Sequence, residues 1–188
     1  GNAGIPFRLP PLAIASNPLC FAYVGRLVAE KGLPLLVEAA AQLQDRQCNF
    51  HLKFVGDGPE RPRLEQMAAA KGLSSKVVFT GFLRGEALRQ ATEDVAAVVM
   101  PSIWEETAGL AAMEQMMRGR LVIAANIGGL GEVVDGAGLT FAAGNVDLLV
   151  RPLVFQRFAH IHPLVTLVGA IGGIGYFGLL GILIGPLA

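Results

Sequence analysis

The chain has 188 residues, with 15 Lys and Arg balanced by 15 Asp and Glu, so its formal net charge at pH 7 is zero. This length allows one domain, and the charge balance leaves no basic field of the kind that binds nucleic acid. The cysteines, Cys20 and Cys48, form no Cys-x-x-Cys pair and no cluster with histidines. They predict no zinc site and fit a reducing compartment.

The first 19 residues are rich in Pro, Gly and Asn and are expected to form a linker. They contain neither a basic segment nor an unbroken apolar core, so no secretory signal is predicted. We therefore expect the domain that follows to be cytoplasmic.

Short apolar runs alternate with longer helical patterns from residue 20 onward. Runs of about five residues predict strands at Cys20–Val24, Phe50–Val55, Lys76–Thr80, Val95–Met100 and Leu121–Ala124. Helices are predicted at Lys31–Gln44, Pro59–Lys71, Gly85–Thr92 and Gly109–Arg118. This alternation predicts βαβ units, and the near-continuous apolar strands predict a parallel sheet covered on both faces. The fold class is α/β, a doubly wound parallel sheet.

Informative loops follow all five predicted strands. They begin at Gly25, Gly56, Gly81, Pro101 and Asn126. Doubly wound sheets bind ligands beyond the carboxyl ends of their strands, so these loops should share one functional edge. Trp104 in the fourth loop is expected to serve packing.

Two segments carry candidate ligand-binding chemistry. In the first, Arg26 and Lys31 stand five residues apart after the first strand, and both side chains bind phosphate well. In the second, Gly109 opens a helix whose N–H groups suit a phosphate. Glu106 and Glu114 flank this helix start and could accept hydrogen bonds from sugar hydroxyls. Ordinary surface charges remain an alternative for both segments.

Residues 163–188 form a segment of 26 residues without charge, long enough for a bilayer core that needs about 20. Its glycines include the pairs Gly169/Gly173 and Gly181/Gly185, at the spacing that lets membrane helices approach. The segment is predicted to be a transmembrane helix or a broken, re-entrant helix. A buried core helix is the alternative.

The motifs of residues 20–148 resemble those of family 4 glycosyltransferases. They are Phe-Ala-Tyr-Val-Gly-Arg-Leu-Val-Ala-Glu-Lys-Gly, Val-Gly-Asp-Gly-Pro-Glu, Val-Val-Met-Pro-Ser, Glu106-x7-Glu114 and Ile-Gly-Gly-Leu-Gly-Glu, in the order of that family. The resemblance implies the C-terminal, donor-binding half of a two-domain GT-B fold. It also implies retaining transfer from a nucleotide-diphosphate sugar without a metal or other cofactor.

The resemblance also implies roles for individual residues. Arg26, Lys31 and Glu106 would carry the catalytic functions, the first two at the donor diphosphate and the third at the transferred sugar. Donor-binding positions would be Gly25, Gly56, Phe82, Gly109, Leu110 and Glu114, with Phe82 near the nucleobase, Gly109 and Leu110 giving N–H contacts, and Glu114 at the ribose. The family's acceptor domain and the last helices of its donor domain have no counterpart in this sequence.

Residues 149–188 resemble a different family. Arg151-Pro152-Leu-Val, Ile161-His162-Pro163-Leu164 and the glycine-rich run after them are similar to the C-terminus of the autoinducer-2 exporter family. The predicted organisation is therefore a linker at 1–19, a nucleotide-sugar-binding domain at 20–148 and a membrane segment at 149–188. The basic residues would face the cytoplasm.

Three hypotheses follow for the whole chain. It is a membrane-tethered donor-binding half that needs a separate acceptor domain, a transporter fragment that carries a passenger domain, or a non-functional fusion of two gene fragments joined near residues 146–150. Donor binding that depends on Arg26 would separate the first from the second.

Overall fold

The computed structural model describes residues 18–105 and 109–158, with backbone alone at 155–158. It contains one six-stranded sheet whose pairings are all parallel, in the order β3-β2-β1-β4-β5-β6. The strands are β1 Leu19–Val24, β2 Phe50–Val55, β3 Val77–Gly81, β4 Val95–Met100, β5 Leu121–Ala125 and β6 Leu139–Phe141. The predicted parallel α/β sheet is confirmed.

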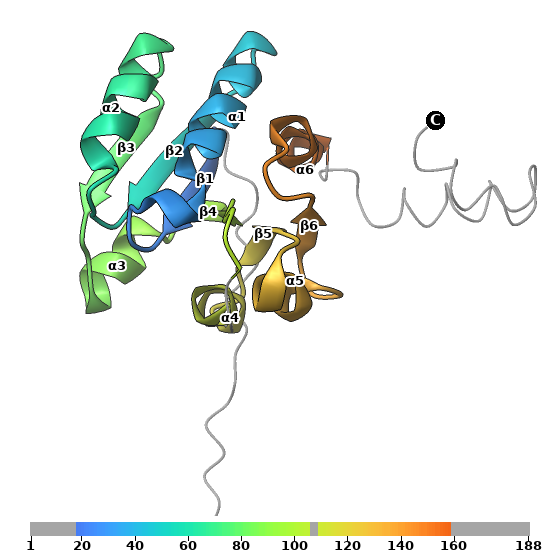
Figure 1. Cartoon of the computed structure of the whole chain (residues 1–188). Coiled ribbons are helices and arrows are strands. Elements are labelled where there is room, and N and C mark those ends of the chain that lie inside the picture. Colours follow the sequence, from blue (N-terminus) through green and yellow to red (C-terminus); the bar gives the residue numbers. More distant parts are fainter. Residues whose placement is uncertain (1–17, 106–108, 159–188) are drawn as a thin grey trace, which may run out of the picture. The chain divides into compact units, whose positions relative to one another are not determined.

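A helix follows every strand (Figure 1). The short 3-10 helix η1 spans Ala29–Lys31, and the α-helices are α1 Leu33–Asp45, α2 Arg61–Ala70, α3 Gly85–Ala91, α4 Leu110–Met117, α5 Gly128–Val134 and α6 Val146–Phe158. Helix α1 begins two residues later than predicted, because Gly32 has a left-handed conformation (φ 62°) that separates η1 from α1.

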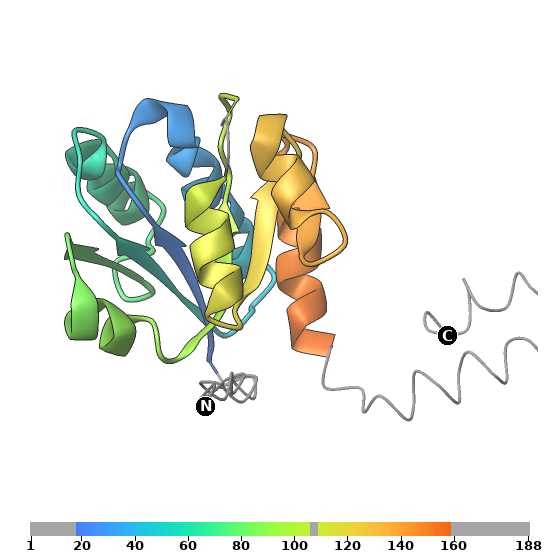
Figure 2. The same cartoon turned by 90° about the horizontal axis from the view of Figure 1, so that it is seen from below.

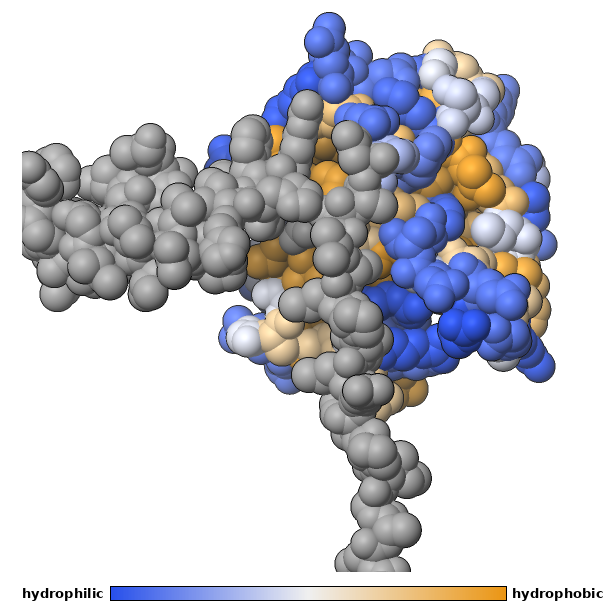
Figure 3. Space-filling view, turned by 180° about the vertical axis from the view of Figure 1, so that it is seen from behind, coloured by the Kyte–Doolittle hydropathy of each residue, from blue (hydrophilic) through white to orange (hydrophobic). Residues whose placement is uncertain are grey.

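The sheet is buried on both faces, because side chains of one strand point alternately to opposite sides. Phe21 and Tyr23 of β1 pack in the cluster that includes α1, α2 and α6, whereas Cys20 and Ala22 pack with residues of α4 and α5. Figures 1 and 2 show these two groups of helices on opposite sides of the sheet. Figure 3 shows apolar patches between hydrophilic residues on one face of the molecule.

Five of the six strands match the predicted ones within about one residue. Strand β6 and helices α5 and α6 were not predicted. Strand β6 has three residues, of which Leu139 and Thr140 are exposed, so it lacks an apolar run. Helix α5 begins with two glycines, Gly128 and Gly129, which are poor helix formers.

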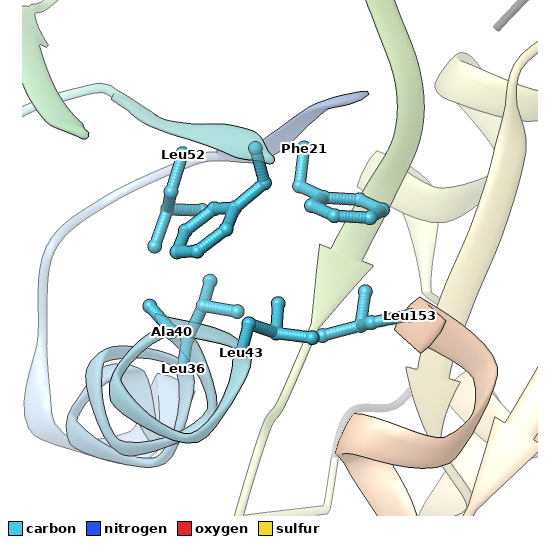
Figure 4. A pocket seen from close by; sticks show the side chains of 7 residues that line it. Phe21, Leu36, Ala40, Leu43, Leu52 and Leu153 are labelled. Carbon is cyan, nitrogen blue, oxygen red and sulfur yellow. The ribbon is translucent and has the colours of Figure 1, made fainter. Parts of the chain in front are cut away.

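Helix α6 is part of the core of the α/β unit. Leu149, Val150 and Leu153 are buried. Leu153 faces Phe21 and Leu43 across a small apolar pocket between α1, the sheet and α6 (Figure 4). The helix runs through residues 148 and 149 without a break. The contacts divide the chain into the units Gly1–Val154 and Phe155–Ala188.

The predicted linker at 1–19 lies outside the described residues, apart from Pro18 and Leu19. Of the predicted membrane segment at 149–188, residues 149–158 belong to α6, and the uncharged stretch at 163–188 lies outside the described residues. Within the part that the structure describes, no helix is both long and apolar enough to span a membrane.

Candidate functional site

The order of the strands places a topological switch point between β1 and β4, at the carboxyl edge of the sheet. The chain proceeds outward from β1 to β3 and then returns to the other side of β1, where it forms β4, β5 and β6. The loops that leave β1 and β4 lie at this reversal of strand order, and the adjoining part of the carboxyl edge, called the crevice from here on, is where doubly wound sheets bind ligands. The β1 loop carries Arg26 and Lys31, and the β4 loop leads to Gly109.

The loops after β1 and β2 are locked together by backbone hydrogen bonds. Gly25 N–H donates to the Val55 carbonyl (3.0 Å), and Leu27 N–H donates to the Asp57 carbonyl (2.9 Å). A Cβ at Gly56 would overlap the Gly25 carbonyl oxygen, and φ at Gly56 is +147°. Glycine at 56 thus allows a close approach between two segments of the chain itself.

Arg26 projects from a loop whose backbone is held in place. Its side chain is exposed, and the Tyr23 hydroxyl donates a hydrogen bond to its carbonyl (2.8 Å). Lys31 ends η1, four residues after the buried Leu27. Both cations predicted for the site therefore belong to one short, anchored loop, where they can act on the same anion.

The β1 loop is also tied to the β4 loop across the crevice. Ile103 N–H donates to the Glu30 carbonyl (3.0 Å). At Gly32, an added Cβ would overlap the Pro101 carbonyl oxygen and lie 2.9 Å from Cγ2 of Ile103. These contacts fix the β1 loop relative to the start of the loop that leads to α4.

The N-terminus of α4 opens at the same edge. Gly109 is buried and has a left-handed conformation (φ 51°). Its carbonyl accepts hydrogen bonds from Ala112 (2.8 Å) and Met113 (3.1 Å), and Leu110 is 71% exposed. The first N–H groups of a helix have no partner within it and sit at the positive end of its dipole. Gly109 and Leu110 therefore present a surface suited to an anion.

Glu114 lies one turn further along α4, at its exposed face. Its Oε1 accepts a hydrogen bond from Nη2 of Arg118 at 2.6 Å. The nearby Arg120 donates to Oε1 of Gln115 (2.8 Å), and Gln115 is buried. Burial lowers the pKa of Arg120, Arg118 lowers it further and Glu114 opposes the change, so these charged groups form one cluster.

Of the remaining predicted site residues, Phe82 lies in the loop after the edge strand β3, on the carboxyl side of the sheet. Phe82 follows β3 and is 63% exposed, and the guanidinium of Arg84 stacks 4.7 Å from its ring centroid. Glu106 lies outside the described residues. Trp104, expected to serve packing, is 69% exposed; this expectation was wrong because the loop after β4 extends beyond the core.

Sequence reasoning missed Arg118 and Arg84. The four-residue spacing between Glu114 and Arg118 on a predicted helix was a usable signal, because such residues are neighbours on a helix surface. Nothing comparable marked Arg84, whose contact with Phe82 depends on the turn after β3.

Among residues 18–105 and 109–158, no group of three or more His, Cys, Asp or Glu side chains could hold a metal ion.

A parallel sheet of this order, with cations and a helix N-terminus on either side of its switch point, defines a nucleotide-binding α/β domain. The sequence comparison identifies its family. Residues 7–153 match the family described as Glycosyl transferases group 1, so the chain belongs to this family of transferases. This match extends beyond both ends of the range 20–148 marked by the motifs.

One curated relative is 2-deoxystreptamine glucosyltransferase of Streptomyces kanamyceticus. It is 38% identical over 131 residues, which cover 69% of this chain and 34% of that protein. The chain thus spans about a third of the length of this relative.

Solved structures show the same fold. HepE of Anabaena, crystallised with UDP, matches with 25% identity and a TM-score of 0.68, over 78% of this chain and 41% of HepE. The C-terminal domain of LpcC, a group 1 protein of Francisella tularensis, matches with 23% identity and a TM-score of 0.63, over 73% of this chain and 74% of that domain. The chain therefore has the fold of one half of a GT-B glycosyltransferase.

Proposed function

We propose that this chain binds the nucleoside diphosphate of a nucleotide-sugar donor in the crevice between the β1 loop and the N-terminus of α4. The observation that carries the proposal is the position of Arg26 and Lys31 at the switch point, on a loop tied to the β4 loop by the Ile103–Glu30 hydrogen bond. A diphosphate between two cations and a helix N-terminus would be stabilised from both sides. The complex of HepE with UDP supports this ligand class.

The site residues then take the following roles. Arg26 and Lys31 neutralise the charge that develops on the leaving diphosphate, and Gly109 and Leu110 donate backbone N–H groups to it. Glu114 accepts the ribose hydroxyls, Glu106 contacts the transferred sugar, and the loop at Phe82 lies beside the base. Gly25 and Gly56, whose backbones approach each other closely, let the donor lie near the main chain of the β1 and β2 loops.

The complete reaction is proposed as retaining, metal-independent glycosyl transfer. The chain spans about a third of its curated relative, and we propose that turnover also requires an acceptor-binding domain in addition to the donor-binding α/β unit. Transfer that proceeds in EDTA would support metal independence. Retained anomeric configuration, measured by NMR of the product, would support the retaining reaction. Inversion, or loss of activity restored by a divalent cation, would contradict them.

The donor site is tested by thermal unfolding of the full chain with UDP, GDP or ADP. A ligand at about 100 times its Kd stabilises a protein by roughly 2.7 kcal/mol. For a domain of this size that is a rise in Tm of about 5–11 °C. Arg26→Ala should abolish most of the rise. Arg46→Ala is the matched control, because Arg46 is exposed at the C-terminal end of α1, away from the crevice.

We further propose that residues 163–188 associate with the membrane and that the α/β unit faces the cytoplasm. The uncharged length of 26 residues supports this proposal. Retention of the expressed chain in membranes after alkaline carbonate extraction would agree with it. Full release of the chain would contradict it, and membrane retention without any nucleotide binding would favour the transporter-fragment alternative.

A further inference from the structure

The ion pair between Arg118 and Glu114 places a guanidinium directly on the carboxylate assigned to the donor ribose. The Nη2–Oε1 distance is 2.6 Å, and both side chains are partly exposed on α4. Helical side chains lean toward the N-terminus of their helix. Arg118, the residue that ends α4, therefore reaches back one turn to the carboxylate of Glu114.

A second cation supports this arrangement. Arg120 is held by its hydrogen bond to the buried Gln115, and burial lowers its pKa, with Arg118 as a second cause and Glu114 opposing the change. The carboxylate of Glu114 thus has two guanidinium groups nearby in the sequence, of which Arg118 donates to Oε1. A carboxylate has about four acceptor positions on its two oxygens, so this bond leaves capacity for two neighbouring ribose hydroxyls.

We propose that Arg118 is a positioning residue for the donor ribose, acting through Glu114. This inference rests on the proposed function. A flexible glutamate loses rotamer freedom when it binds a ligand, and a charge-assisted hydrogen bond made beforehand reduces that loss. Arg118 holds the carboxylate in one orientation before the nucleotide arrives, and the ribose hydroxyls then bind an acceptor that is already fixed.

The alternative is an ordinary surface ion pair that supports only the helix. Such a pair four residues apart has a small effect on folding, and its removal would not distinguish one nucleotide from another. A positioning role predicts an effect confined to ligands that carry the ribose hydroxyls. The two roles therefore differ in ligand dependence.

The test measures Kd of the full chain for UDP and for 2′,3′-dideoxy-UDP by calorimetry. We expect Arg118→Met to weaken UDP binding by about three- to tenfold, a fraction of the ordering cost of one long side chain, and to leave dideoxy-UDP binding unchanged. Arg118→Lys should recover part of the affinity. Arg89→Met is the matched control, because Arg89 forms an equivalent exposed pair with Glu86 on α3.

A double variant tests whether Arg118 acts through Glu114. In a Glu114→Gln background, Arg118→Met should have no further effect on UDP affinity, because no carboxylate remains to be positioned. If the wild-type chain prefers UDP to dideoxy-UDP and Arg118→Met has the same Kd values as wild type, the role of Arg118 is overturned and the proposed function remains intact. Equal weakening of both ligands would also overturn it. A wild-type chain that binds no nucleotide would refute the proposed function itself, and the role of Arg118 with it.

Discussion

Replacing Gly32 by alanine should separate the two loops that form the crevice. The residue has φ 62°, and an added Cβ would overlap the carbonyl oxygen of Pro101. The left-handed conformation costs a non-glycine residue about 1–2 kcal/mol. Relief of the overlap must move the β4 loop, which breaks the hydrogen bond from Ile103 to Glu30, worth about 0.5–1.5 kcal/mol.

The free energy of unfolding should therefore fall by about 1.5–3.5 kcal/mol, which lowers Tm by roughly 3–14 °C in a domain of this size. UDP affinity should fall by about tenfold, the equivalent of one lost charge-assisted hydrogen bond. Urea unfolding and calorimetry measure the two quantities.

Gly136→Ala is the matched control for this substitution. Gly136 also has a positive φ (74°), but an added Cβ would meet nothing within 4 Å. It should lose only the conformational cost of about 1–2 kcal/mol and keep its UDP affinity. Equal stability losses in both variants, with UDP affinity unchanged in Gly32→Ala, would refute the claim that this contact shapes the site.

Three further predictions concern the core, the β1 loop and the buried thiol. Leu149→Ala should cost about 2–5 kcal/mol in urea unfolding because Leu149 is fully buried, whereas the exposed Arg151→Ala should cost under about 0.5 kcal/mol; similar losses would contradict the placement of α6 in the core. Tyr23→Phe removes the hydrogen bond to the Arg26 carbonyl and should cost about 0.5–1.5 kcal/mol, and an unchanged Tm would count against that bond. Burial, with Asp94 as a second cause, raises the pKa of the Cys20 thiol from 9.0 to about 11. The unfolded chain therefore loses the thiol proton at a lower pH than the folded chain, so the free energy of unfolding should fall between pH 9 and 11. This fall should be absent in Cys20→Ala.

The sheet could be predicted because its strands are buried on both faces. Strands such as Val95–Met100 then become unbroken apolar runs, which the sequence displays directly. The same dependence on burial explains why β6 and α6 were not predicted. Strand β6 lies at the edge with two exposed residues, and α6 combines buried leucines with Arg151 and an internal Pro152, so neither has a clean periodic pattern.

The edge that carries the candidate site could also be predicted, because parallel strands bring all their following loops to one side. The detailed contacts could not. The resemblance implies a donor-binding role for Gly56, but its motif did not predict the close approach of Gly56 to Gly25 of the neighbouring loop. The stacking of Arg84 on Phe82 depends on side-chain conformations that residue spacing does not determine.

The central claim is that the nucleoside diphosphate lies between the β1 loop and the N-terminus of α4. Amide hydrogen exchange of the full chain, with and without saturating UDP, tests it most directly. We predict slower exchange in peptides that cover residues 25–32 and 109–114, and no change in peptides that cover residues 45–49 and 71–76 at the opposite edge of the sheet. Protection at that opposite edge, or saturable binding that leaves residues 25–32 and 109–114 unprotected, would contradict the account.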